Sequence, residues 1–300
     1  MTQSSAPPVP TLPQERQEEE ASGYWHDTLR RLLRHRVGLI GLVIVTLLIL
    51  LGIFGRVAAP YDPNAIDMSA RFLPPTVAHP LGTDDFGRDT LSRIMYGARI
   101  SLQVGIIAVS IAATVGTLLG LLAGYGNRLL DEVIMRSMDV LFAFPAILLA
   151  IAILAALGKG VANAMIAIGV VYIPIFARIA RGEVLSIRNE EFIEAAEASG
   201  AGHARILFKH ILPNAMGPLI VETSLSLAFA ILAEAALSFF GLGTQPPDPS
   251  WGRMLSEGRA YFQQSIWMGF FPGLAIMLTV MGFNFLGDGL RDAMDPRQRE

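Results

Sequence analysis

Cysteine is absent from the 300-residue chain, so the sequence can form neither a disulfide framework nor a thiolate metal site or nucleophile. Charge is also scarce, because Asp, Glu, Lys and Arg make up 16% of the residues, whereas an ordinary soluble domain is about a quarter charged. Hydrophobic residues make up 52%. No long basic run accompanies the formal net charge of −3, so we expect no nucleic-acid partner. These features predict an integral membrane protein.

Enzyme motifs are missing as well. The sequence contains no HExxH and no GxSxG motif. Its one Gly-Lys pair, Gly158-Lys159, is followed by glycine and lacks the hydroxyl residue and upstream glycine of a phosphate-binding loop. We therefore predict no catalytic residue, no metal ligands and no bound cofactor in this chain.

Six segments are long and apolar enough to cross a hydrocarbon core of about 30 Å, which takes about 20 helical residues. They are 37–57, 100–123, 138–157, 161–178, 215–240 and 267–286. An inside N-terminus puts fifteen of the 23 cations in cytoplasmic segments and eight in outer ones, which is the bias of natural membrane proteins. An even number of spans returns the C-terminus to the cytoplasm. We predict an all-α, multi-pass protein with both termini inside.

The ends of the chain differ from the spans. Residues 1–23 are rich in Pro, Ser, Gln and Glu and predict a disordered cytoplasmic tail. Residues 24–96 are expected to hold an Arg-rich amphipathic segment facing membrane lipid, the first span and an extracytoplasmic loop. Residues 97–288 hold the other five spans, and 289–300 form a cytoplasmic C-terminal tail.

Three glycines, Gly116, Gly120 and Gly124, recur at four-residue spacing in the second span. Small residues let another helix approach closely, so this face is expected to pack against protein. In the outer loop, His79, Asp84, Asp85 and Asp89 could be metal ligands. Their spacing matches no recognised site, and we favour pairing with Arg residues and capping of an amphipathic elbow before that span.

The segment 189–214 is the longest charged stretch among the spans. Asn189 is expected to be the N-cap of a short helix, and Gly200 to end that helix in the left-handed conformation. Pro213 would prevent a second short helix from continuing without a kink. The first helix has one narrow face of small and aromatic residues: Phe192, Ala195, Ala196 and Ser199. We predict a cytoplasmic hairpin that docks onto a partner.

Ionisable residues inside spans are costly and indicate function. Asp139 lies near the inner end of the third span, and Glu222 lies near the middle of the fifth, with Ser226 one turn further on. Glu234 lies near the outer end of the fifth span. We expect these groups to line a pathway or pair helices, with a proton relay as the alternative. Loss of Glu222 is expected to be more damaging than loss of Glu234.

The segment EAAEASG followed by HILPN resembles the EAA loop of type I importer permeases in the ATP-binding-cassette superfamily. The outer segments YDPN, LPP, HPLGTDDFGRD and LSRIMYGARISL, and the closing RDAMDPR, are similar to the second permease subunit of dipeptide, oligopeptide and nickel importers. The similarity covers about residues 25–297. One departure is His210, which replaces the usual isoleucine. The matching loop positions are Glu194, Ala195, Ala196, Gly200, Leu212 and Pro213.

The resemblance implies the six-helix type I importer permease fold in a bacterial plasma (inner) membrane. It also implies a heterodimer with a homologous permease, two cytoplasmic ATPase subunits that bind ATP and Mg, and an extracytoplasmic substrate-binding protein. The EAA loop would sit in a groove on an ATPase. Peptides are the expected substrate, with nickel or another small solute as the alternative. Two rivals of other classes are a proton-coupled transporter using Glu222 or Asp139, and a scaffold without transport activity.

Overall fold

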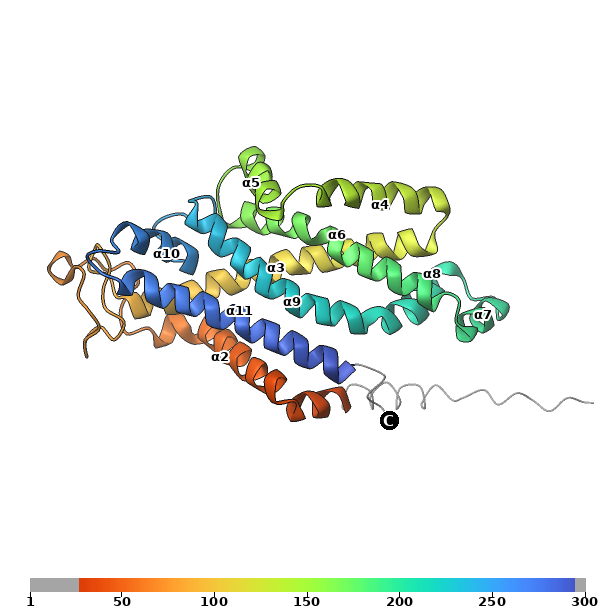
Figure 1. Cartoon of the computed structure of the whole chain (residues 1–300), viewed down its shortest axis with the longest axis horizontal. Helices are drawn as coiled ribbons and strands as arrows, with labels where there is room; N and C mark the ends of the chain where they lie inside the picture. Colours follow the sequence, from red (N-terminus) through yellow and green to blue (C-terminus); the bar gives the residue numbers. More distant parts are fainter. Residues whose placement is uncertain (1–26, 295–300) are drawn as a thin grey trace, which may run out of the picture.

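The computed structural model describes residues 27–294, so the expected tail at 1–23 and the last six residues lie outside it. The described part is a bundle of long helices that run along one axis (Figure 1), and it contains one isolated bridge, between Thr83 and Asp89. Five helices are long and apolar enough to cross a membrane. They are α2 (Arg36–Ala58), α3 (Thr90–Tyr125), α6 (Val161–Ile187), α9 (Leu212–Phe239) and α11 (Trp267–Met294).

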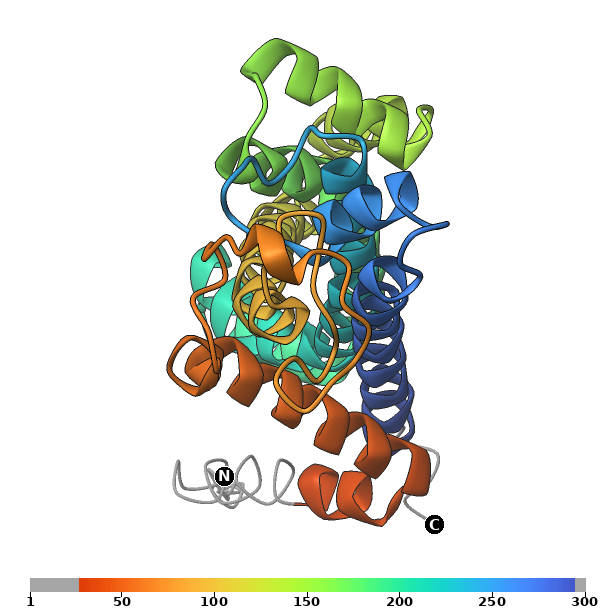
Figure 2. The same cartoon turned by 90° about the vertical axis from the view of Figure 1, so that its left-hand side faces the viewer.

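The third predicted span, 138–157, is wrong as a continuous helix. The chain forms two helices there, α4 (Arg128–Phe142) and α5 (Ala146–Leu157), with an angle of 94° between them. Pro145 precedes the first residue of α5. Proline has no N–H to donate and disfavours helical geometry in the preceding residue, which explains a break at this point. The bent pair lies on the opposite side of the bundle from α2 (Figures 1 and 2).

Several helices extend beyond their predicted spans. The expected elbow before the second span is the first part of α3, which begins at Thr90 after the N-cap Asp89, so the expected division at residue 96 falls inside a helix. α6 continues to Ile187, and α11 continues to Met294, so the first six residues of the expected C-terminal tail, 289–294, are helical. These extensions carry polar residues, and a search for apolar runs therefore stops before them.

α3 packs closely on α6 through the three glycines, as predicted. A Cβ on Gly116 would lie 2.5 Å from the carbonyl oxygen of Ile173, and one on Gly120 would overlap the carbonyl of Ala177. A Cβ on Gly124 would lie 2.7 Å from the Cβ of Val184. The second span is therefore fixed against a neighbouring helix over its last three turns.

The two ends of the bundle differ. At one end, called the hairpin end, lie the short helices α7 (Glu191–Ala198) and α8 (His203–Arg205). At the other, called the loop end, lie residues 59–89, with the short helix η1 (Met68–Ala70), and α10 (Trp251–Ala260). Viewed from the loop end, residues 59–89 lie in front of the long helices (Figure 2).

Candidate functional site

The hairpin, residues 189–214, turns at Gly200 as the sequence predicts. Gly200 has φ +80°, and the amide of Ala201 donates to the carbonyl of Ala196 at 3.0 Å. This is the hydrogen bond of a Schellman motif, which ends a helix through a left-handed residue. Asn189 was wrongly assigned as the N-cap: its side chain donates to the carbonyl of Leu185 in α6, and Glu190 occupies the cap position of α7.

The second arm of the hairpin is not a separate short helix. α8 continues through a π-helical turn, η2 (Ile206–Ile211), directly into α9. Pro213 directly follows this π-helical turn, in the first turn of α9, and does not break the arm. The hairpin is therefore continuous with a membrane helix.

The predicted docking face of α7 points outward. Phe192, Ala195 and Ser199 are exposed, and Ala196 is half-buried. The sequence did not single out Ile193, which is 1% exposed and packs in a cluster with Leu121 of α3 and Val184 of α6. Burial of this one side chain holds α7 against the bundle and leaves the small-residue face free.

Two polar contacts tie the hairpin, and the end of α6 that leads into it, to the end of α3. Tyr125 Oη and His203 Nδ1 are 2.9 Å apart, and Arg188 donates to the carbonyl of Gly124 at 3.2 Å. Arg188 thereby satisfies a carbonyl in the last turn of α3, where intrahelical donors run out. The contacting residues are 78 and 64 positions apart in the chain, so no local sequence pattern pairs them.

Replacing Gly200 by Ala is expected to loosen α7. A left-handed residue with a Cβ costs about 1 kcal/mol, so amide hydrogen exchange in α7 should become about fivefold faster by local opening. Asn tolerates this conformation better than Ala, so Gly200→Asn should show a smaller increase. Equal exchange in both variants and the wild type would contradict the role of the turn.

The two carboxylates of α9 have different surroundings. Glu234 is 1% exposed and accepts hydrogen bonds from Ser101 Oγ of α3 at 3.0 Å and from Ser238 Oγ at 2.7 Å. Glu222 is half-buried and accepts one from Ser226 Oγ, on its own helix, at 2.8 Å. Burial and contacts therefore favour Glu234 as the more sensitive of the two, whereas position along the span favours Glu222.

Asp139 lies on the outside of the bundle. Its side chain is 59% exposed and pairs with Arg178 of α6 at 2.9 Å. The guanidinium of Arg178 also lies 4.0 Å from the ring centroid of Phe142. Asp139 thus connects α4 to α6 on the surface.

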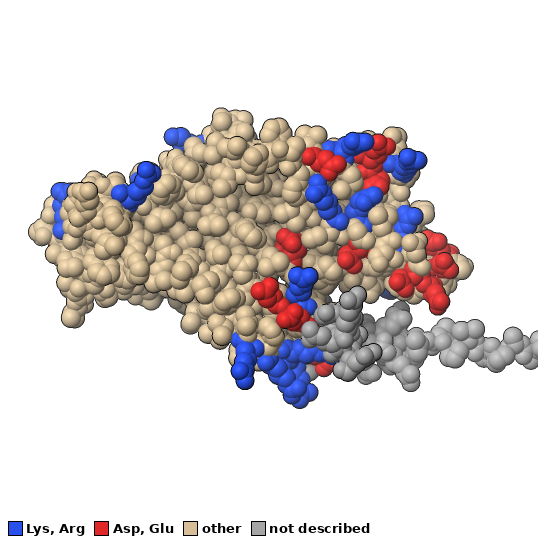
Figure 3. Space-filling model, in the orientation of Figure 1, with Lys and Arg blue, Asp and Glu red and all other residues tan. Residues whose placement is uncertain are grey.

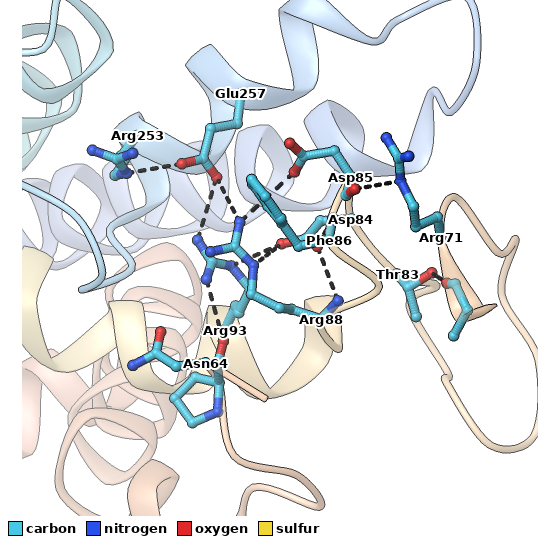
Figure 4. Close-up of polar contacts among 12 residues, drawn as sticks. Asn64, Arg71, Thr83, Asp84, Asp85, Phe86, Arg88, Arg93, Arg253 and Glu257 are labelled. Atoms are coloured by element: carbon cyan, nitrogen blue, oxygen red, sulfur yellow. Dashed lines mark hydrogen bonds and ion pairs between the residues drawn. The ribbon is translucent and has the colours of Figure 1, made fainter. Parts of the chain in front are cut away.

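A buried ionic network crosses the loop end (Figure 4). Arg93, 1% exposed, donates to Glu257 of α10 at 3.3 Å and to the carbonyl of Pro63 at 3.2 Å, and its Nε lies 3.4 Å from Asp84. Arg88 donates to Asp84 at 2.6 Å. The network joins the outer loop to α3 and α10, so these parts of the loop end are held together.

The four candidate metal ligands of the outer loop have these structural roles instead. Asp84 binds the two arginines, and Asp89 caps α3 through Ser92 while lying 3.0 Å from His79. Among residues 27–294 no group of three or more His, Asp or Glu side chains is placed to hold a metal ion. The preferred interpretation, pairing and capping, agrees with these contacts.

Two aspartates of the outer loop should give stability effects of opposite sign with pH. Burial and the nearby carboxylate of Asp84 raise the pKa of Asp85, whereas hydrogen bonds from Ser69 lower the pKa of Asp67. Asp85 therefore costs stability as pH rises through its folded-state pKa, and Asp67 loses its contribution as pH falls through its own. Thermal unfolding should show Asp85→Asn gaining stability on the wild type as the pH rises from 4.5 to 7.5, and Asp67→Asn losing stability on the wild type as the pH rises from 2.5 to 4.5. The same sign for both variants would contradict this assignment.

Comparison with known proteins identifies a family and a fold that this architecture matches. Residues 116–300 match the model of the binding-protein-dependent transport system inner membrane component, and residues 23–75 match the N-terminal transmembrane domain of oligopeptide transport permease C. The solved MetNI methionine ABC transporter, in an inward-facing conformation, is similar in fold. Its TM-score is 0.56 at 19% identity, over 66% of this chain and 94% of the other.

Full-length relatives give the same result. The dipeptide transport system permease protein DppC of Alkalihalophilus pseudofirmus is 48% identical over 97% of this chain and 96% of its own. The glutathione transport system permease protein GsiD of Pectobacterium atrosepticum is 46% identical over 91% of each chain. The probable D,D-dipeptide transport system permease protein DdpC of Escherichia coli is 46% identical over 85% and 86%. The chain belongs to the family of binding-protein-dependent transport system inner membrane components.

Proposed function

We propose that this chain is a permease subunit of an ATP-driven importer for dipeptides or short oligopeptides. The observation that carries the proposal is the match over nearly the whole chain to relatives that are named for dipeptide, D,D-dipeptide and glutathione transport. These three substrates are all peptides with a free amino group and a free carboxylate. Nickel or another small solute is the alternative cargo of the same class of importer.

The hairpin is proposed to connect the permease to a cytoplasmic ATPase. Its exposed face is thin, because alanine and serine flank Phe192, and a thin face fits into a groove. The contacts of Ile193, Tyr125 and Arg188 would pass a movement of the hairpin to α3 and α6. The proposed coupling residues are Glu194, Ala195, Ala196, Gly200, Leu212 and Pro213.

The remaining subunits follow from this assignment. We assign this chain no catalytic role; ATP and Mg would bind to two ATPase subunits, and an extracytoplasmic binding protein would deliver the peptide. A homologous permease would supply the other half of the pathway. The Lys and Arg distribution, with fifteen of 23 in the segments assigned to the cytoplasmic side, supports a cytoplasmic hairpin end in a bacterial plasma membrane.

The proposal is tested by purifying the chain from its host with its associated subunits and reconstituting them in liposomes. Uptake of L-alanyl-L-alanine should require ATP hydrolysis and the binding protein, and a protonophore should leave it unchanged. Uptake by this chain alone, driven by a pH gradient, would instead identify a proton-coupled transporter. Uptake of nickel without any peptide would identify the alternative cargo, and no flux of any solute would support a scaffold.

A further inference from the structure

A groove of about 560 Å³ lies between α6, α9 and α11 toward the hairpin end. Its walls carry Glu183 of α6, Glu222 of α9 and Arg291 of α11. Charges of both signs gather at this end of the face shown in Figure 3, whereas the middle of the bundle carries few. The groove therefore places a few charged groups in a recess of the largely apolar bundle surface.

The two carboxylates of the groove have no cationic partner in the described part of the chain. Within residues 27–294, the only hydrogen bond to the Glu222 carboxylate is donated by the hydroxyl of Ser226, and Glu183 takes part in no hydrogen bond or ion pair. Both side chains are half-buried. Asp131, in contrast, binds Arg181 through two hydrogen bonds of 2.6 and 2.8 Å on another face of α6. Partial burial of an unpaired carboxylate costs free energy. The groove therefore favours a positively charged ligand, which would pair with these carboxylates.

The backbone of α9 adds a further acceptor on the same wall. Pro218 lines the groove and has no N–H, so the carbonyl of Asn214 lacks its usual helical donor. Gly182 and Gly217 also line the groove, and a Cβ on Gly182 would have no neighbour within 4 Å. The wall formed by α6 and α9 is therefore open and carries acceptors, which is the chemistry that binds an ammonium group.

The opposite wall has the complementary charge. Arg291 is exposed and has no hydrogen bond or ion pair with any residue of the described range. Arg178, the other guanidinium of the groove, is already held by Asp139 at 2.9 Å. A free guanidinium offers two parallel donors that match a carboxylate.

We infer that this groove is a binding subsite for a zwitterionic peptide, with the amino terminus on Glu183 and Glu222 and the carboxyl terminus on Arg291. The inference rests on the proposed function and adds a position on this chain where the peptide is held. A volume of about 560 Å³ lies within the range of roughly 300–1,000 Å³ for small-ligand sites. The competing explanation is that these charges are solvated side chains with no ligand. In that case, binding would not depend on whether the peptide has free termini.

The test measures peptide binding to the whole importer in lipid nanodiscs without its binding protein. The probes are L-alanyl-L-alanine, its N-acetyl derivative and its C-terminal amide. Glu222→Gln or Glu183→Gln should weaken binding of the free dipeptide roughly tenfold to a hundredfold, the range for losing one charge-assisted hydrogen bond. The same change should scarcely affect the N-acetyl derivative, whereas Arg291→Gln should weaken the dipeptide and scarcely affect the amide.

Controls separate this result from loss of structure. Glu132→Gln, at an exposed carboxylate of α4 paired with Arg136, should bind the dipeptide as the wild type does. Glu222→Asp keeps the charge and should retain more affinity than Glu222→Gln. Equal affinity of the wild type for all three probes, no binding of the dipeptide, or unchanged affinity in the groove variants would each overturn the inference.

The two proposals can fail separately. If the wild-type importer takes up the dipeptide with its binding protein while the groove variants bind it normally, the subsite is wrong and the proposed function stands. If the wild type takes up no peptide at all, the proposed function fails and the subsite fails with it.

Discussion

Ala196→Arg is expected to reduce ATP-driven uptake by at least about a hundredfold while the protein still inserts into the membrane and ATP hydrolysis continues. Ala196 lies on the outward face of α7 beside Ala195, and the helix itself is held by the buried side chain of Ile193. A guanidinium on this face would enter the proposed ATPase groove without a partner, and burying an uncompensated charge costs about 3–5 kcal/mol. Docking would fail, but the interior of the permease would be unchanged.

Uptake and ATP hydrolysis should be measured in the same proteoliposomes. Ala198→Arg is the matched control, because it is the same substitution at an exposed position of α7, about a third of a turn from the middle of the docking face. It should retain most of the uptake. Normal uptake in Ala196→Arg, or equal loss in both variants, would contradict docking through this face.

Hydropathy predicted five of the six spans but not the form of the third. An apolar run indicates which residues avoid water but not the direction of the chain, so hydropathy predicts one helix over 138–157. Pro145, in the middle of that run, was the available signal for the break between α4 and α5. Where no proline interrupts the apolar pattern, as in α2, prediction and structure agree within two residues.

The hairpin shows which parts of a site local patterns reveal. Helical spacing found the outward face of α7, and glycine chemistry found the turn at Gly200. The hydrogen bond between Tyr125 and His203 joins residues 78 positions apart, and that between Arg93 and Glu257 joins residues 164 positions apart. Such pairs leave no periodic trace in one sequence, so only the three-dimensional structure brings them together.

Depth along the helix and burial rank the two membrane carboxylates differently. Glu222 is closer than Glu234 to the middle of α9, and the sequence therefore favoured it as the sensitive residue. The neighbours of each group depend on which way its side chain faces, because twelve residues at about 100° each rotate the two side chains apart by about a third of a turn. Glu234 faces Ser101 of α3, whereas Glu222 faces the groove.

Glu234→Leu should therefore destabilise the permease more than Glu222→Leu. The first change removes the acceptor for Ser101 and Ser238, both of which are buried. Hydroxyl bonds of this kind are worth about 0.6–1 kcal/mol each in membrane proteins, and the leucine must also fit a space shaped by a carboxylate, so the loss should be about 2 kcal/mol. Glu222→Leu removes a bond within one helix at a half-buried position and should cost less than about 1 kcal/mol.

The thermal unfolding temperature in detergent measures both variants under one condition. Glu234→Gln is the matched control, because it keeps an acceptor for the hydroxyl of Ser101 in nearly the same shape, and it should lose less than half as much stability as Glu234→Leu. The structural role of Glu234 predicts that uptake falls only in proportion to the amount of folded protein. A drop in uptake with unchanged stability would instead mean that the carboxylate acts in transport, and equal stability of Glu234→Leu and Glu222→Leu would show that the contact between α9 and α3 contributes nothing measurable.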